Sequence, residues 1–237
     1  MFNGKMKAVT FSYDDGVSQD LRMIDLFNKY GLRATFNLNS SGFGAVNSFR
    51  YGENNDRVYY RHVVHAEDVK YIYRGHEVAA HTVHHPDLTT ISEEEIITEV
   101  NDDIEALSAL VGYDTTGFAY PCRTPDDRVI EIVKNKTRAR FARTTGSNHR
   151  FALPSDLFRF TCTASHHEPC LIDLAKEFLE AKADEPMLFS VWGHSYQFDY
   201  TKQWDEFEEF CRIISGHDDV FYGTNSEVLL GTPDIYS

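Results

Sequence analysis

Residues 7–16 read Lys-Ala-Val-Thr-Phe-Ser-Tyr-Asp-Asp-Gly, a short apolar run that ends on two carboxylates and a glycine. Large apolar side chains at positions 9, 11 and 13 alternate with hydroxyl side chains at 10 and 12, which is typical of a β-strand. Gly16 then permits a sharp turn. Asp14 and Asp15 are therefore expected at the C-terminal end of a strand, where α/β proteins bind ligands and carry out chemistry. Because Asp-Asp-Gly is also ordinary turn chemistry, the rest of the chain has to decide between these interpretations.

Strand-like and helix-like segments alternate along the rest of the chain. We expect further strands at 33–38, 76–82, 117–121, 138–144, 158–163, 187–192 and 220–224, and helices at 18–30, 66–74, 92–110, 126–135, 172–182 and 204–214. Residues 39–61 are rich in Gly, Ser and Asn and lack a helical period, which predicts a long loop over one rim. Seven or eight strands separated mostly by helices predict an α/β fold, a single distorted (β/α) barrel of mostly parallel strands spanning residues 1–237.

The composition narrows the possible partners. The 237 residues carry a formal net charge of −14, which would repel nucleic acid and anionic membrane surfaces, so a neutral or cationic substrate is easier to accommodate. No apolar run is long enough to span a bilayer, and the first residues lack the apolar core of a signal peptide. We therefore expect a cytoplasmic protein.

Four cysteines occur, at positions 122, 162, 170 and 211. Their spacing contains no Cys-x-x-Cys pair and no regular framework, so we expect reduced, buried thiols rather than metal ligands.

Polar residues that suit a metal-assisted hydrolase follow several of the expected strands. Asp14 and Asp15 close the first strand, His81 and His85 follow the third, and His194 follows a late one. If the strands are parallel, these side chains converge on one rim. Two histidines four apart and an aspartate make an open divalent-metal site. A second carboxylate can then accept a proton from water, and the opposite histidine can give one to a leaving group.

The same residues carry a resemblance to the polysaccharide deacetylases of carbohydrate esterase family four. Residues 12–16 (SYDDG) resemble the family motif Thr-Phe-Asp-Asp-Gly, and residues 34–36 (ATF) are similar to its second strand. Residues 81–86 (HTVHHP) match His-Ser/Thr-x-x-His-Pro, and residues 191–195 resemble the late Leu-x-His motif. The resemblance extends from the first strand to about residue 199, and more loosely over 222–230. It implies a metal-dependent deacetylase with a distorted β/α barrel.

The resemblance also implies roles for individual residues. Asp14 would be the general base and His194 the general acid, while Asp15, His81 and His85 would hold a divalent metal. Zn²⁺ is the first expectation, with Co²⁺, Mn²⁺, Ni²⁺ or Fe²⁺ as alternatives. Thr82 would bond the loop that fixes the ligands. The other histidines, His149 among them, are expected on the surface or in packing, although a shift of one residue would make His84 the ligand instead of His85.

The third family motif departs from its usual form. The family has an arginine ahead of Pro-Pro-Tyr, whereas this chain has Ala119, then Tyr120, Pro121 and Cys122. Arg123 and Arg143 are the candidates to supply the missing cation, and the sequence does not choose between them. Tyr120 and Trp192 are further candidates for contacting the substrate or orienting the base.

Three functions remain open at this point. The leading one is removal of an acetyl group from an N-acetylated, or O-acetylated, carbohydrate, with an acetylated sugar or oligosaccharide as the partner. The second is hydrolysis of another non-peptide C–N bond, such as a cyclic amide or ureide, and the third is carbohydrate binding without catalysis. The presence of Asp14 and His194 argues against the third.

Overall fold

A parallel sheet forms the centre of the protein. The computed structural model describes residues 2–52 and 54–236. In that part of the chain, nine strands form one sheet in the order β8-β7-β6-β5-β2-β1-β10-β9, and β11 also pairs with β1. All of these pairs are parallel. The strands are β1 (Lys7–Asp14), β2 (Ala34–Leu38), β5 (Glu77–Ala80), β6 (Gly117–Ala119), β7 (Phe141–Ser147), β8 (Phe160–Cys162), β9 (Ala164–Ser165), β10 (Met187–Gly193) and β11 (Val220–Tyr222).

The predicted α/β fold with mostly parallel strands is confirmed, but the described strands do not close a barrel. Instead, the sheet curls until its two edge strands, β8 and β9, follow each other in the chain with only Thr163 between them. The backbone N–H of Thr163 donates to Ser190 Oγ at 3.0 Å, which joins this segment to β10. One predicted strand is displaced by three residues: residues 138–144 were expected, whereas β7 runs from Phe141 to Ser147.

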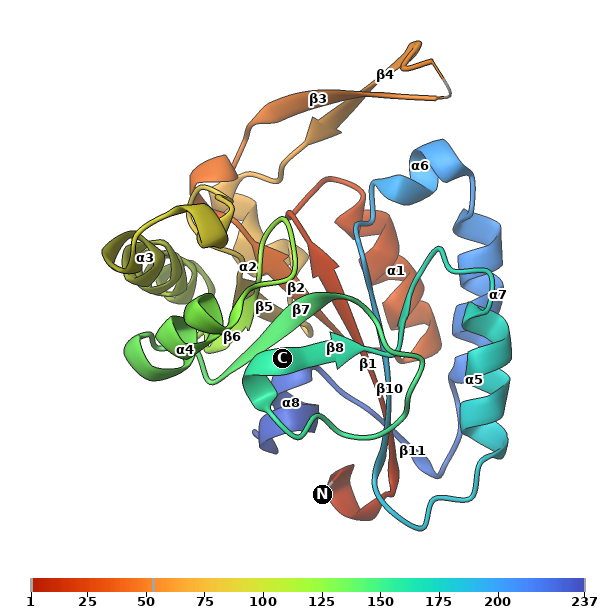
Figure 1. The fold of residues 1–237 in the computed structure, drawn as a ribbon. Helices are drawn as coiled ribbons and strands as arrows, with labels where there is room; N and C mark the ends of the chain where they lie inside the picture. The colour runs from red at the N-terminus through yellow and green to blue at the C-terminus, as the bar shows by residue number, and fades with distance from the viewer. Residues whose placement is uncertain (1, 53, 237) are drawn as a thin grey trace.

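Helices cover the sheet on both sides (Figure 1). Figure 1 shows α3 and α4 at one side of the curled sheet and α1, α5 and α7 at the other. Local signals set their ends: Ser92 and Glu95 form the predicted capping box of α3, and Gly31 ends α1 in a left-handed conformation. The helices are α1 (Asp20–Tyr30), α2 (Val69–Ile72), α3 (Glu93–Val111), α4 (Asp127–Lys136), α5 (Leu171–Glu180), α6 (Gln197–Thr201), α7 (Trp204–Ile214) and α8 (Asn225–Leu230), with short 3₁₀ turns at Phe2–Gly4, Ser40–Gly42, Ala66–Asp68, Leu88–Thr90 and Leu157–Arg159.

The central strand β1 is buried on both faces, and the two faces differ in chemistry. On one face Phe11 and Tyr13 pack against Phe27 of α1, with ring centroids 4.6 and 6.0 Å apart. On the other face the side chains are hydrogen-bonded. Thr10 donates to Asn225 of α8 at 2.9 Å, and Asn37 of β2 donates to Ser12 at 2.9 Å. The polar face of β1 ends at Asp14, so the strand that builds the core also delivers a carboxylate to the rim.

The prediction of a long loop over residues 39–61 is wrong in part. An antiparallel hairpin, β3 (Val46–Tyr51) and β4 (Arg57–His62), extends from the rim at the C-terminal ends of the strands (Figure 1). Its aromatic side chains pack on α6: the Phe49 ring lies 5.7 Å from Tyr196, and the Tyr51 ring lies 5.2 Å from Tyr200. These partners follow about 150 residues later in the chain, so the local sequence gives no sign of the apolar contact with α6 that supports the hairpin.

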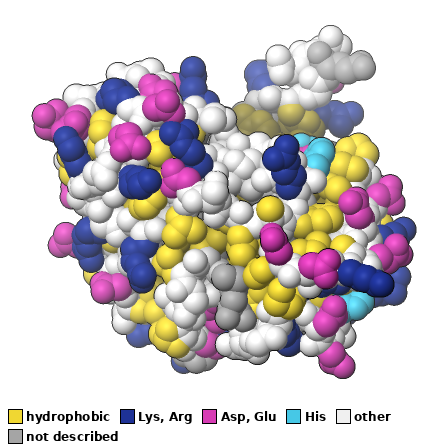
Figure 2. All heavy atoms as spheres, turned by 60° about the horizontal axis from the view of Figure 1, so that its bottom comes forward, with side chains coloured by type: hydrophobic (Ala, Val, Ile, Leu, Met, Phe, Trp, Pro, Cys, Tyr) yellow, Lys and Arg dark blue, Asp and Glu magenta, His cyan; other side chains and the backbone are white. Residues whose placement is uncertain are grey.

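Helix hydropathy and surface charge bear on the partners predicted from the sequence. No helix among the described residues is long and apolar enough to cross a membrane. Figure 2 shows acidic and basic side chains interspersed on the face that it turns forward, so the negative charge is not gathered into one patch there.

All four cysteines are free, as expected. Cys162 and Cys211 are buried, but Cys122 is exposed and Cys170 is partly exposed, so the prediction that all four are buried is wrong.

Candidate active site

A left-handed turn brings Asp14 and Asp15 to the same place. Adjacent residues of a strand point to opposite faces, but the chain leaves β1 with Asp15 at φ 80° and Gly16 at φ 60°. The backbone N–H of Asp15 still donates to Asn37 O at 3.0 Å, which fixes this turn against β2. A Cβ atom on Gly16 would lie 2.8 Å from the Leu38 side chain. The glycine is therefore needed for both its conformation and its small size.

Asp15, His81 and His85 converge on one point. Their ligand atoms all lie within 4.8 Å of one another, and Asp15 Oδ1 is 4.0 Å from His81 Nε2 and 3.8 Å from His85 Nε2. His81 Nδ1 lies 2.8 Å from the carbonyl oxygen of Ala119, and burial lowers the pKa of His81 to about 4. A neutral imidazole that donates Nδ1–H to a carbonyl leaves the Nε2 lone pair free for a ligand. This donor set fits a divalent metal with open coordination positions.

The loop after β5 holds the two histidines through strained backbone. Thr82 has φ 71° and His85 has φ 57°, values that non-glycine residues rarely adopt. Thr82 Oγ1 donates to His81 O and accepts from the His85 N–H, the latter at 3.1 Å. His84 turns away and contacts Glu99 through both its backbone N–H (2.8 Å) and its Nδ1 (2.7 Å). The structure thus brings His85, and not His84, to Asp15.

Asp14 lies beside a buried arginine from another strand. Arg143 Nη2 contacts both carboxylate oxygens of Asp14, at 2.7 and 2.6 Å, and Asn37 Nδ2 donates to Oδ1 at 2.8 Å. Burial raises the pKa of Asp14, but the Arg143 guanidinium and the neighbouring histidines outweigh it and hold the pKa below its ordinary value. Arg143 is the register partner of Ala119 in the parallel β6–β7 pair. The cation missing at Ala119 is therefore supplied from the adjacent strand.

The other candidates for this role lie elsewhere. Arg123 is exposed, and its Nε pairs with Asp87 at 2.8 Å. Tyr120 is buried in the core, and its hydroxyl donates to Phe158 O at 3.2 Å. The structure brings neither side chain to Asp14, and Tyr120 belongs to the hydrophobic core.

His194 follows β10 and faces both aspartates. Its Nε2 lies 3.9 Å from Asp14 Oδ2 and 3.9 Å from Asp15 Oδ2. The Trp192 ring stands beside it, with ring centroids 6.2 Å apart, and carries the Arg143 guanidinium 5.2 Å above its own centroid. Trp192 therefore packs against both the proposed acid and the cation beside the proposed base.

Two residues at this rim were not found from the sequence. Arg61 of β4 places Nη1 2.5 Å from Asp15 Oδ2, so Arg61 contacts the oxygen that faces away from His81 and His85. Asp20 accepts hydrogen bonds from the Val17 N–H (3.1 Å) and from the Ser195 hydroxyl (2.5 Å), and burial raises its pKa to about 7. Asp20 thus ties the turn after Asp15 to the residue after His194. The helical period around Asp20 and the expected loop around Arg61 gave no signal for either contact.

A cavity of about 260 Å³ lies between the hairpin and the proposed ligands. Its lining includes Asp15, Asn39, Asn47, Arg61 and His85. A small ligand in this cavity would therefore contact both the hairpin and the histidine loop.

Comparison with known proteins follows the motifs. Residues 3–139, more than half of the chain, match the family model described as "Polysaccharide deacetylase". A curated relative, the "Probable peptidoglycan-N-acetylglucosamine deacetylase" of Arthroderma benhamiae, is 27% identical over 116 residues, which are 48% of this chain and 23% of the relative. The chain thus spans about a quarter of the length of that relative.

Solved structures share the fold over nearly the whole chain. The Xyl-CE4 domain of a multidomain xylanase from the hindgut metagenome of Trinervitermes trinervoides is 17% identical, with a TM-score of 0.57, covering 97% of this chain and 94% of that one. A family 4 acetyl xylan esterase from Clostridium thermocellum, solved with a cobalt ion, is 16% identical, with a TM-score of 0.57, covering 96% of this chain and 93% of that one. At these identities the likeness concerns the fold.

Proposed function

The chain belongs to the polysaccharide deacetylase family, and we propose that it is a metal-dependent hydrolase that removes an acetyl group from an N-acetylated, or O-acetylated, carbohydrate. One observation carries the proposal: a carboxylate kept ionised by a buried arginine, a three-ligand cluster and a histidine all meet at one rim. This set supplies a base, a metal site and an acid within one small volume.

Asp15, His81 and His85 would hold the metal, for which Zn²⁺ is the first candidate. A divalent cation at such a centre makes water more acidic and polarises an acyl carbonyl. Asp14 would accept the proton from the attacking water, because its own carboxylate, which is paired with Arg143, stays ionised at neutral pH. His194, on the opposite side, would donate a proton to the leaving nitrogen or oxygen. The separation of 3.9 Å between His194 Nε2 and Asp14 Oδ2 exceeds a direct hydrogen bond and leaves them free to act on different atoms.

A second candidate function rests on Arg61. Its ion pair with Asp15 balances the charge of that carboxylate from within the protein. Such a pair suits a metal-independent hydrolase of a cyclic amide or ureide, in which no metal neutralises the carboxylate. The free Oδ1 and the neutral His81 favour the metal-dependent function. A cytoplasmic location remains a prediction.

Acetate release from acetylated sugars and oligosaccharides, measured before and after removal of metal, tests the proposal. We expect release to require a divalent metal. Asp14→Asn keeps the shape of the side chain and removes its basicity, so it should bind metal normally but turn over very slowly. Asp15→Asn should bind metal more weakly. Full activity in Asp14→Asn would remove the general-base role, and undiminished acetate release by the metal-free protein would remove the metal requirement. Absence of acetate release both with and without metal would favour the second function.

A further inference from the structure

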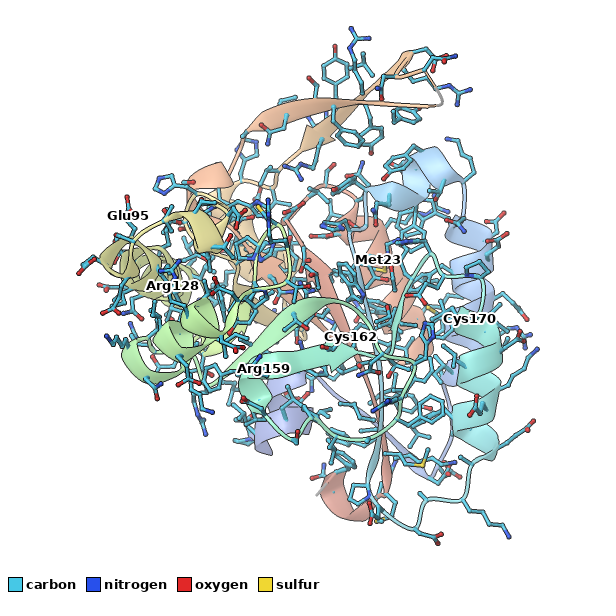
Figure 3. All side chains as sticks on the ribbon, in the orientation of Figure 1. Met23, Glu95, Arg128, Arg159, Cys162 and Cys170 are labelled. Carbon is cyan, nitrogen blue, oxygen red and sulfur yellow. The ribbon has the colours of Figure 1, made fainter. Side chains whose placement is uncertain are left out.

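A second group of ligand-type side chains lies outside the candidate active site. The ligand atoms of His149, Glu168 and Cys170 all lie within 4.8 Å of one another. His149 follows β7, whereas Glu168 and Cys170 both lie in the connection between β9 and α5, so two separate turns contribute. Figure 3 labels Cys170 beside the start of α5. The spacing of the sequence gave no reason to group these residues.

The three ligand atoms face one another as a triangle. Cys170 Sγ lies 3.9 Å from His149 Nε2 and 3.8 Å from Glu168 Oε2, and Glu168 Oε2 also contacts the same His149 Nε2. A catalytic Cys–His–Glu relay would use opposite ring nitrogens for the thiol and the carboxylate. Here both meet one nitrogen, which suits a shared ion. Tetrahedral Zn²⁺ with ordinary bond lengths places sulfur and nitrogen ligands about 3.5 Å apart, close to the 3.9 Å between Cys170 Sγ and His149 Nε2. The carboxylate of Glu168 is in direct contact with His149 Nε2 and would have to separate from it to admit the ion.

Neighbouring groups orient two of the ligands. Glu168 Oε1 accepts from the Ser165 N–H at 2.8 Å and from the Ser147 hydroxyl, which leaves Oε2 for the cluster. Partners of this kind commonly orient metal-binding carboxylates. Cys170 is the N-cap residue of the ten-residue helix α5, and this place in the fold fixes its backbone.

We propose that His149, Glu168 and Cys170 form a second divalent-metal site, suited to Zn²⁺, with the remaining coordination open to solvent. The His149 side chain is 50% exposed, which gives an ion a path from solvent. The simpler interpretation, an exposed His149–Glu168 ion pair, leaves the position of Cys170 unexplained and would contribute little stability.

The site would brace one wall of the candidate active site. Ser147, which donates to Glu168, accepts a hydrogen bond from Trp192 Nε1 at 3.4 Å, and Trp192 stands beside His194. An ion that joins the turns after β7 and β9 to α5 would therefore hold Ser147, the hydrogen-bond partner of Trp192, in place. This inference does not depend on the proposed deacetylase activity.

Cobalt absorption tests the site, because a Co²⁺–thiolate bond gives a near-ultraviolet charge-transfer band that nitrogen and oxygen ligands do not give. Metal-free protein should develop this band on addition of Co²⁺, and Cys170→Ser should abolish it. The band should survive His85→Ala, which disrupts the first cluster. Cys122→Ser is the matched control, because Cys122 Sγ lies 3.6 Å from His85 Nδ1 and is the other thiol near a candidate ligand. The band should survive this change as well.

Zinc stoichiometry gives an independent measurement. We expect two equivalents of Zn²⁺ in the unchanged protein and one in each of Cys170→Ser, His149→Ala and His85→Ala. His149 is exposed, so His149→Ala should fold normally, as circular dichroism can check. A cobalt–thiolate band that persists in Cys170→Ser, or zinc content unchanged in both Cys170→Ser and His149→Ala, overturns the proposal. Loss of the band in Cys122→Ser alone would move the thiolate to the first cluster and also overturn it.

Discussion

Removing the guanidinium of Arg143 gives the sharpest test of the proposed base. Arg143→Met keeps an unbranched side chain but deletes a fully buried cation that contacts Asp14 at 2.6 and 2.7 Å. Breaking a buried ion pair costs about 3–5 kcal/mol, because the remaining charge stays buried without compensation. We expect a loss of that order in the free energy of unfolding at pH 7, measured by denaturant titration.

The loss should depend on pH. The lowered pKa of Asp14 stabilises the native protein above the ordinary Asp value, and this contribution disappears as pH falls through the native pKa. In Arg143→Met the pKa of Asp14 should rise instead, because burial then acts on the carboxylate without the guanidinium. Protonation of Asp14 then removes the uncompensated charge from the variant. The difference in the free energy of unfolding between Arg143→Met and the unchanged protein should therefore shrink as pH falls from neutral toward about 4.

Activity and a matched control complete this test. The acid limb of kcat/KM should move to higher pH in Arg143→Met, because the base must be unprotonated to act. Arg123→Met removes an exposed arginine that pairs with Asp87, and should change stability by no more than about 0.5 kcal/mol and leave the acid limb in place. A double-mutant cycle with Asp14→Asn isolates the pair. If Arg143→Met unfolds at the same denaturant concentration as the unchanged protein and keeps its acid limb, the guanidinium does not hold the base.

Three further predictions concern the rest of the rim. His194→Ala should lower turnover by roughly 10²–10⁴-fold, while substrate affinity, measured by calorimetry, changes much less; unchanged turnover would place the acid elsewhere. His85→Ala should lose most of the metal bound at the first cluster, whereas His84→Ala should keep it, because His84 faces Glu99; mass spectrometry of bound metal compares the two variants. Arg61→Ala should weaken metal binding in a competition titration, since the contact with Asp15 orients a proposed ligand; unchanged affinity would leave Arg61 without that role.

The sequence predicts what is local. The alternation in residues 7–14, the Ser92 capping box and the glycine after residue 30 each act within a few positions, and the structure contains the elements that they indicate. Arg143 reaches Asp14 across 129 positions, and only the strand order places it beside Ala119. The hairpin escaped prediction because α6, which lies far away in the chain, provides part of the surface on which its aromatic side chains pack. The left-handed conformation of Asp15, which decides how the two adjacent carboxylates are aimed, has no signature beyond the glycine that follows.

The curling of the sheet has a consequence for solubility. An edge strand usually presents unpaired N–H and C=O groups on which another chain can add. Here β8 and β9, the two ends of the strand order, are consecutive pieces of residues 160–165, so these two edges lie next to each other and are only three and two residues long. The Thr163 hydroxyl donates to Arg150 O at 3.0 Å, and the Asn148 N–H donates to Cys162 O at 3.0 Å. The turn after β7 therefore covers part of the place where β8 and β9 lie side by side. Loosening that turn would expose both edges at once, and the expected result is self-association through β-strand pairing before the core itself unfolds.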